Sequence, residues 1–285
     1  MIKKKFIIGE EWLYYKIYCG AKTADLLLTK QIKPLVIFLL QQNYIDKWFF
    51  IRYNDSDHHL RIRFHLSNLQ HIGFIITQVK EVLSPLIENR SIHKIETATY
   101  NRELKRYGAD TIVQAETLFF NDSMLILEAL ELIKDEDTLL KFVLKNTMDL
   151  LENCNLDDTQ KLQFVKEQME AFKVEFHVNK KSNKQLTEKY RNRKQEIEVF
   201  LENTTKQKEH KPLHQFLKNK NKRDKQVLGK ILMSKNVSIT NKMSSFVHMS
   251  INRSFRTKQR LYEMLCYDFL VRYYKTKIAK AKYLQ

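Results

Sequence analysis

The chain has 285 residues and a formal net charge of +17, because 50 Lys and Arg residues stand against 33 Asp and Glu residues. Hydrophobic residues make up 43% of it, which is typical of a packed globular core and not of a disordered polycation. The longest uninterrupted apolar run, residues 35–40, is far shorter than the roughly 20 residues that cross a bilayer. The start, MIKKKFIIGEEW, lacks the long apolar segment of a secretory signal. We therefore expect a cytoplasmic protein without a membrane span.

The spacing of cysteine and glycine excludes further classes. Cys19, Cys154 and Cys266 lie far apart and form no CxxC pair, so neither a disulfide framework nor a thiolate zinc site is expected. The chain has only 5 glycines and contains neither GxxxxGK[ST] nor GxGxxG. Standard P-loop and dinucleotide-binding functions are therefore not expected.

The positive charge is concentrated in the C-terminal part of the chain. Residues 1–177 carry 23 basic and 25 acidic side chains, a net charge of −2, whereas residues 178–285 carry 27 and 8, a net charge of +19. Such a surface attracts polyanions, although a set of solvated helix faces has the same composition. The run KNKNKRDK at 218–225 has no apolar residue to bury and is predicted to be a loop or linker.

The first third of the chain alternates between strand-like and helix-like segments. Pro34 is expected to break or restart the first helix, because proline lacks a backbone N–H. Aromatic and β-branched runs, or helical spacing of apolar residues, predict in order a strand over 12–19, a helix over 23–42, strands over 47–53 and 59–66 joined by the polar loop 54–58, a helix over 70–89 and a strand over 91–100.

Beyond residue 110 the pattern is helical. The expected fold class is α+β, with a mixed or antiparallel sheet built mainly from the N-terminal third and surrounded by a larger helical portion. We expect one domain over 1–285, with a strand-rich part at 1–108 and a mostly helical part at 109–285. The expected helices span 110–132, 136–153, 158–177, 183–203, 225–238, 241–255 and 259–280.

The predicted strand at 59–66 is the first chemical signal. Its apolar residues alternate with His59, Arg61, Arg63 and His65, so these four side chains point to one face. Neighbouring guanidinium groups repel each other unless an anion lies between them, and their planar shape suits a carboxylate or a phosphate. The structural alternative is an exposed strand face with solvated cations.

Two further segments combine basic and polar residues. In YNRELKRYG (100–108), Arg102 and Arg106 are four residues apart and would share one face of a helical turn that Gly108 ends. Glu103 would pair with either arginine in a purely structural interpretation. In SFVHMSINRSF (245–255), His248 and Asn252 lie one turn apart, so Asn252 is a candidate partner for a ring nitrogen. A histidine among apolar residues is also compatible with a core position.

Together these segments resemble the glutamate-elimination domain of lantibiotic dehydratases, which also occurs as a separate chain labelled a thiopeptide-type bacteriocin biosynthesis protein. The resemblance covers nearly the whole chain in the right order, although Ala109 stands where relatives often have a second glycine. Its segments are GEEWLYYKIYCG (9–20), KWFFIRYNDSDHHLRIRFH (47–65), YNRELKRYG (100–108), AETLFFNDS (115–123) and SFVHMSINRSF (245–255).

The resemblance implies an activity. It implies elimination of glutamate from glutamylated Ser and Thr of a ribosomally made precursor peptide, which gives dehydroalanine and dehydrobutyrine. No metal or organic cofactor is implied. The implied catalytic residues are Arg63, Arg102 and His248, with His248 acting as acid or base, and the implied substrate-binding residues are Arg61, Arg106, Asn252 and Arg253.

The same resemblance implies partners and alternatives. A separate glutamylation protein that uses glutamyl-tRNA would supply the substrate, and a homodimer is compatible with the family. One alternative is an enzyme of the same fold that forms a pyridine by aza-[4+2] cycloaddition. In those enzymes the glutamate-binding positions usually diverge, so the arginines and histidine here favour elimination. The second alternative is a non-catalytic module that binds a leader peptide or nucleic acid, as the basic C-terminal part allows.

Overall fold

The computed structural model describes residues 2–55, 57–204, 208–234 and 238–283. Its main sheet has four antiparallel strands in the order β3-β4-β2-β5, and a small second sheet pairs β1 with β6. Both sheets come from the N-terminal third, which confirms the α+β prediction. The strands span Lys5–Phe6 (β1), Trp12–Cys19 (β2), Ile45–Asn54 (β3), His58–Leu66 (β4), Ile92–Thr97 (β5) and Tyr100–Asn101 (β6).

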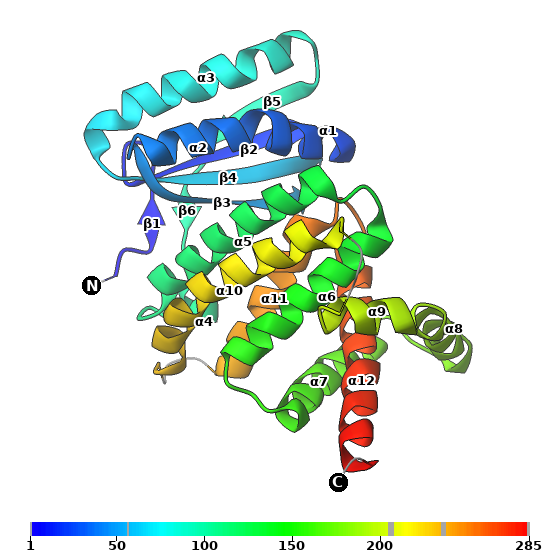
Figure 1. The fold of residues 1–285 in the computed structure, drawn as a ribbon. Coiled ribbons are helices and arrows are strands. Elements are labelled where there is room, and N and C mark those ends of the chain that lie inside the picture. The colour runs from blue at the N-terminus through cyan, green and yellow to red at the C-terminus, as the bar shows by residue number, and fades with distance from the viewer. Residues whose placement is uncertain (1, 56, 205–207, 235–237, 284–285) are drawn as a thin grey trace.

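Helices cover the sheet and fill the rest of the molecule. In Figure 1, α2 and α3 lie on one side of the sheet, and α5, α10 and α11 lie on the other. The helical segments span Ala21–Leu26 (α1), Leu27–Ile32 (η1, a π-helix), Lys33–Gln41 (α2), Leu69–His71 (η2, a 3-10 turn), Ile72–Glu88 (α3), Leu104–Tyr107 (α4), Ile112–Leu132 (α5), Glu136–Asn153 (α6), Asp158–Glu175 (α7), Lys180–Arg191 (α8), Lys194–Leu201 (α9), His210–Leu232 (α10), Ile239–Ser254 (α11) and Gln259–Tyr283 (α12).

The alternation in β4 places its two faces in different environments. Leu60, Ile62 and Phe64 are buried in the core that also contains residues of α1, η1, α2 and α3. Arg61 and Arg63 lie on the opposite face, where the paired residues of β3 are Ile51 and Phe49. The strand period of two therefore directs the arginines toward the helical half of the molecule.

Several local predictions are corrected. The hairpin pairing reaches Asn54 and His58, so the connection is shorter than the predicted loop 54–58, and its Ser56 lies outside the described residues. The prediction for Pro34, in contrast, is confirmed: the helix restarts there after a π-helical turn, because proline cannot donate to the carbonyl four residues earlier. The helix predicted over 183–203 is divided into α8 and α9.

The largest correction concerns the segment 218–225, which is helical and lies inside α10. Lys220 and Asp224 are buried one turn apart and form an ion pair, and Asp224 also accepts a hydrogen bond from Asn121 at 2.8 Å. A helix can therefore be anchored by buried charges where it has no apolar residue. The predicted helix 225–238 begins too late, and its residues 235–237 lie outside the described residues.

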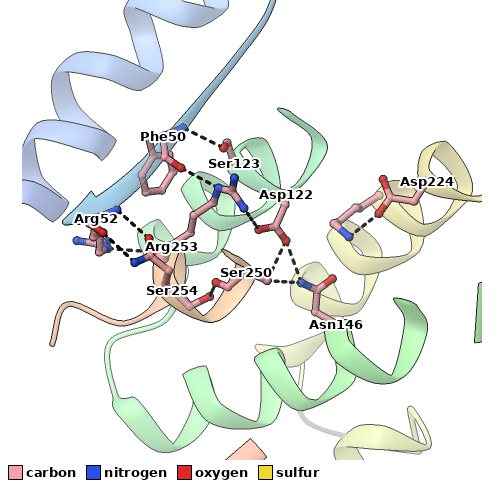
Figure 2. A network of polar contacts seen from close by, with 11 residues as sticks. Phe50, Arg52, Asp122, Ser123, Asn146, Asp224, Ser250, Arg253 and Ser254 are labelled. Carbon is pink, nitrogen blue, oxygen red and sulfur yellow. Dashed lines mark hydrogen bonds and ion pairs between the residues drawn. The ribbon is translucent and has the colours of Figure 1, made fainter. Parts of the chain in front are cut away.

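The end of α11 is fixed to the sheet through β3. The Asn252 side chain accepts the N–H of Arg52 at 2.9 Å and donates to its carbonyl at 2.8 Å. The guanidinium group of Arg253 donates from Nε to the carbonyl of Phe50 at 2.8 Å and from Nη1 to Asp122 of α5 at 3.1 Å. Figure 2 shows this network, in which Arg253 lies between the strand and Asp122.

We predict that Asp224→Ala lowers the free energy of unfolding by about 3–5 kcal/mol, because it leaves the buried ammonium group of Lys220 without its ion-pair partner. Urea-induced unfolding measures this change. The matched control is Lys222→Ala on the exposed side of the same helix, which should change the free energy by less than about 0.5 kcal/mol. Equal effects of both substitutions would contradict the anchoring role of the pair.

Candidate functional site

Arg63 lies among aromatic rings at the centre of the sheet. Its guanidinium carbon is 4.2 Å from the ring centre of Tyr14 on β2, 5.1 Å from that of Phe49 on β3 and 4.9 Å from that of Tyr100 on β6. The residue is only 8% exposed. Cation–π contacts of this kind compensate part of the lost hydration of the cation.

No carboxylate lies within ion-pair distance of Arg63 in the described part of the chain, although the more distant charge of Glu103 acts on it. No ion pair or hydrogen bond of its guanidinium group is found there, and the buried Nε atom has no acceptor. Burial lowers the pKa of Arg63 below its usual value, and the nearby charge of Arg61 acts in the same direction. A buried cation without a counter-ion is costly, so this position favours an anionic ligand group.

A small cavity of about 40 Å³ adjoins Arg63, and we call it the inner cavity. Glu103 lines it as well, but its carboxylate forms an ion pair with Arg106 at 3.2 Å. Ile51 of β3 and Met249 of α11 also belong to the wall. The inner cavity therefore lies between the polar face of the sheet and α11.

Arg102, in contrast, is fully paired. Its Nε and Nη2 atoms each donate to one carboxylate oxygen of Glu116 at 2.7 Å, and the hydroxyl of Tyr100 donates to the same carboxylate at 2.9 Å. Glu116 is completely buried in α5. Tyr100 thus connects this pair with Arg63, because its ring contacts the Arg63 guanidinium group.

The expectation that Arg102 and Arg106 share a helical face is wrong. The helical turn α4 begins at Leu104, so Arg102 lies outside it, directly after β6. Arg102 points into the interior, and Arg106 is largely exposed with Glu103 as its partner. Gly108 ends the turn as predicted, with a positive φ of 83° that favours glycine.

Arg61 lies on the same face of β4 as Arg63, two residues closer to the connection between β3 and β4. Its guanidinium carbon is 3.4 Å from the ring centre of Tyr53, and it donates to His59 at 3.0 Å and to Asp55 at 3.3 Å. Burial lowers the pKa of His59, which suits a neutral ring that accepts from Arg61 through Nε2. Arg61, unlike Arg63, therefore has its own counter-ion.

His248 lines a second, larger cavity of about 570 Å³, which we call the outer cavity. The Nδ1 atom of His248 is 2.8 Å from a carboxylate oxygen of Glu263 on α12. The sequence offered Asn252 as the ring partner; the structure corrects this, since the amide of Asn252 binds the backbone of β3. The outer cavity is also lined by the cationic residues Arg52, Arg256, Lys258 and Arg260 and by His58.

The predicted site residues are therefore not gathered in one cavity. Arg63 lines the inner cavity, His248 lines the outer one, and Arg102 lines neither. The two cavities are nevertheless neighbours along the sheet. Ile51 of the inner cavity and Tyr53 of the outer cavity are two residues apart on the same face of β3, about 7 Å along the strand.

Asn252 and Arg253, predicted to bind substrate, make contacts within the protein. Asn252 lines the outer cavity while its amide holds β3, and Arg253 is 1% exposed. Within the described chain, the Nη2 atom of Arg253 has no partner. Sequence reasoning missed Glu116 as the partner of Arg102 and Glu263 as the partner of His248. Glu116 nevertheless lies in the segment AETLFFNDS, which carried part of the resemblance.

A family model described as the C-terminal part of lantibiotic biosynthesis dehydratase matches residues 12–274. The chain therefore belongs to this family, which confirms the resemblance found in the sequence. The subtilin biosynthesis protein SpaB of Bacillus subtilis is 24% identical over 263 residues, which are 88% of this chain and 24% of that protein. The nisin biosynthesis protein NisB of Lactococcus lactis subsp. lactis is 32% identical over 126 residues, which are 44% of this chain and 12% of that protein. The chain thus spans at most about a quarter of the length of these two relatives.

Solved structures show the same fold at low sequence identity. The tRNA-dependent lantibiotic dehydratase MibB from Microbispora sp. 107891 matches with a TM-score of 0.74 and 16% identity over 97% of this chain and 29% of that chain. The pyridine synthase TbtD from thiomuracin biosynthesis matches with a TM-score of 0.63 and 11% identity over 94% of this chain and 100% of that chain. One fold is thus shared by proteins with different names and activities.

Two findings bear on other classes of site. No helix among the described residues is long and apolar enough to cross a membrane. Within the same residues, no group of three or more His, Cys, Asp and Glu side chains is arranged to hold a metal ion. The three cysteines are buried free thiols, and burial raises the pKa of Cys19 to about 11.

We predict opposite effects on stability for two neighbouring arginines. Arg102→Met leaves the carboxylate of Glu116 buried without its cationic partner, so it should lower the free energy of unfolding by about 3–5 kcal/mol. Arg63→Met removes a buried cation that has no counter-ion, so the free energy of unfolding should stay unchanged or rise. Urea-induced unfolding of both variants checks this. An equal loss of stability in both would show that Arg63 serves the fold in the way Arg102 does.

Proposed function

We propose that this chain eliminates glutamate from glutamylated Ser and Thr side chains of a ribosomally made precursor peptide. The observation that carries the proposal is the buried guanidinium group of Arg63, which has no carboxylate of the protein within ion-pair distance in the described chain. A protein that leaves one buried cation unpaired, and pairs Arg102 and Arg253 nearby, is suited to receive an anion from outside.

The chemistry of the reaction matches the two cavities. A base removes the proton from the α-carbon of the glutamylated residue, the electron pair forms the Cα=Cβ double bond, and the bond from Cβ to the ester oxygen breaks. Glutamate then leaves as a carboxylate that carries a second carboxylate. Arg63 would stabilise the negative charge that develops on this leaving group, which is an effective form of catalysis in a site without water.

The position of His248 fits the proton transfer. Its ring lines the outer cavity, which is large enough for a segment of peptide, whereas Arg63 lines the inner cavity. Because the two cavities are neighbours along β3, a substrate would place its α-carbon near His248 and its glutamyl group toward Arg63. Arg102 would act indirectly, by fixing Tyr100 through Glu116 against the Arg63 guanidinium group.

The proposal requires a source of glutamylated peptide. In the family that the sequence resembles, a glutamylation activity uses glutamyl-tRNA. We therefore propose that such an activity supplies the modified precursor to this chain. The cation-rich outer cavity and the basic C-terminal part are suited to acidic partners.

Pyridine formation is the second candidate, because the fold covers the full length of the pyridine synthase TbtD. That reaction joins two dehydroalanines and expels no glutamate, so it has no use for a buried cation that binds a dicarboxylate. The presence of Arg63, Arg102 and His248 together favours elimination here.

The test uses a synthetic peptide that carries a glutamyl ester on one serine. We expect the wild-type chain to release free glutamate and to form dehydroalanine, as followed by mass spectrometry. Arg63→Gln and His248→Ala should each lower kcat/KM by about 10²-fold or more, which is typical for the loss of an anion-stabilising group or of a general base. Arg191→Gln, on the exposed side of α8, is the matched control and should be neutral.

Two results would contradict elimination. One is that the wild-type chain releases no glutamate but converts a peptide with two dehydroalanines into a pyridine product, which would establish the second candidate. The other is that the double variant Arg63→Gln, His248→Ala releases glutamate at the wild-type rate, which would place the reaction elsewhere.

A further inference from the structure

His248 is held by a buried carboxylate from the next helix. The Oε2 atom of Glu263 lies 2.8 Å from His248 Nδ1, and the Glu263 side chain is 5% exposed, whereas that of His248 is 33% exposed. The contact joins α11 to α12, two helices that pack side by side. The carboxylate is therefore behind the ring, on the side away from the solvent.

The other groups around Glu263 keep it in place. Nη1 of Arg260 donates to the same Oε2 atom at 2.9 Å, and Arg260 is itself paired with Glu175 of α7. The guanidinium carbon of Arg260 also lies 4.3 Å from the ring centre of Phe172. Glu263 thus has one cationic neighbour and one histidine, both from residues that line the outer cavity.

We propose that Glu263 is a positioning residue that keeps the proton of His248 on Nδ1 and leaves Nε2 free to act as the base of the elimination. This inference rests on the proposed function. An ionised carboxylate only accepts hydrogen bonds, so the Nδ1 atom must be the donor, and the neutral ring then carries its lone pair on Nε2. Within the described chain, Nε2 has no hydrogen-bond partner, and the ring lines the outer cavity.

Of the two roles that the sequence left open for His248, the proposal assigns it that of the base. In the elimination step, Nε2 takes the α-proton, the Cα=Cβ bond forms and the glutamate carboxylate leaves with the electron pair of the Cβ–O bond. The ring becomes an imidazolium with a proton on each nitrogen, and the Glu263 carboxylate stabilises its new charge. The proton then passes to solvent through the open cavity.

The first test compares Glu263→Gln with the wild-type chain on the glutamyl-ester peptide. We expect kcat to fall by roughly 10²-fold to 10⁴-fold with KM changed by less than about threefold, because the amide no longer enforces the Nδ1–H tautomer and carries no charge. Glu263→Asp keeps the charge and should retain more activity than Glu263→Gln. Glu170→Gln removes an exposed carboxylate from α7 and is the matched control, with no expected change.

The second test measures directly which ring nitrogen of His248 is protonated, and it does not depend on enzymatic activity. Nitrogen-15 NMR of the histidine rings at neutral to slightly basic pH should show His248 protonated on Nδ1 in the wild-type chain and mainly on Nε2 in Glu263→Gln. The spectrum of His248→Gln identifies the signal. Thermal unfolding of each variant shows whether it is folded, and Glu263→Asp supplies the comparison if Glu263→Gln is not.

The outcomes separate the two proposals. If the wild-type chain releases glutamate but Glu263→Gln keeps the wild-type kcat and the same tautomer, the positioning role is wrong and the proposed function stands. If the wild-type chain releases no glutamate, the proposed function fails, and the role of Glu263 in it fails as well. A fall in kcat together with the tautomer change supports the inference.

Discussion

The attachment of α11 to β3 is the contact on which the candidate site depends. Asn252 and Arg253 bind backbone groups of Arg52 and Phe50, and Arg253 is joined to Asp122 of α5 (Figure 2). The contacts with β3 connect residues about 200 positions apart in the chain. They bring His248, one turn before Asn252, to the same face of the sheet as Arg63. Without this attachment the two cavities would have no fixed relation to each other.

Three buried arginines of this chain illustrate how differently one side chain can be used. Arg102 and Arg253 each have a carboxylate within hydrogen-bond distance, and both connect segments that must stay together. Arg63 contacts three aromatic rings and forms no ion pair within the described part of the chain. The rings make a cation tolerable without neutralising it, so the position keeps its attraction for an anion. Charge compensation therefore distinguishes the arginines that support the fold from the one that is suited to a ligand.

The family assignment and the geometry complement each other. The family model covers residues 12–274, yet the fold is shared with a lantibiotic dehydratase and with a pyridine synthase, so the fold alone does not select a reaction. The selection proposed here comes from the side chains. Arg63 is suited to a dicarboxylate leaving group, and the contact between His248 and Glu263 is suited to a base whose proton is held on the far side of the ring.

The sequence by itself determined the features that depend on local periodicity. The alternation over 59–66 correctly separated the buried apolar face from the face that carries Arg61 and Arg63, and the strand-rich first third was found where the sheet lies. A strand exposes every second side chain to the same side whatever surrounds it, so no distant contact was needed. The helices of the second half were found by the same reasoning, with two exceptions: the first part of α10, where the buried charges of Lys220 and Asp224 replace apolar residues, and the break between α8 and α9.

Only the tertiary structure decided which partner each charged side chain receives. Nothing in the spacing of residues indicated that Glu116 would pair with Arg102, that Asn252 would bind a strand instead of a ring nitrogen, or that Glu263 would hold His248. Hydrogen bonds and ion pairs depend on positions within about 3 Å, and these positions follow from how separate elements pack. A pattern of residue types records which groups are available, whereas the packing of the helices on the sheet determines which of them meet.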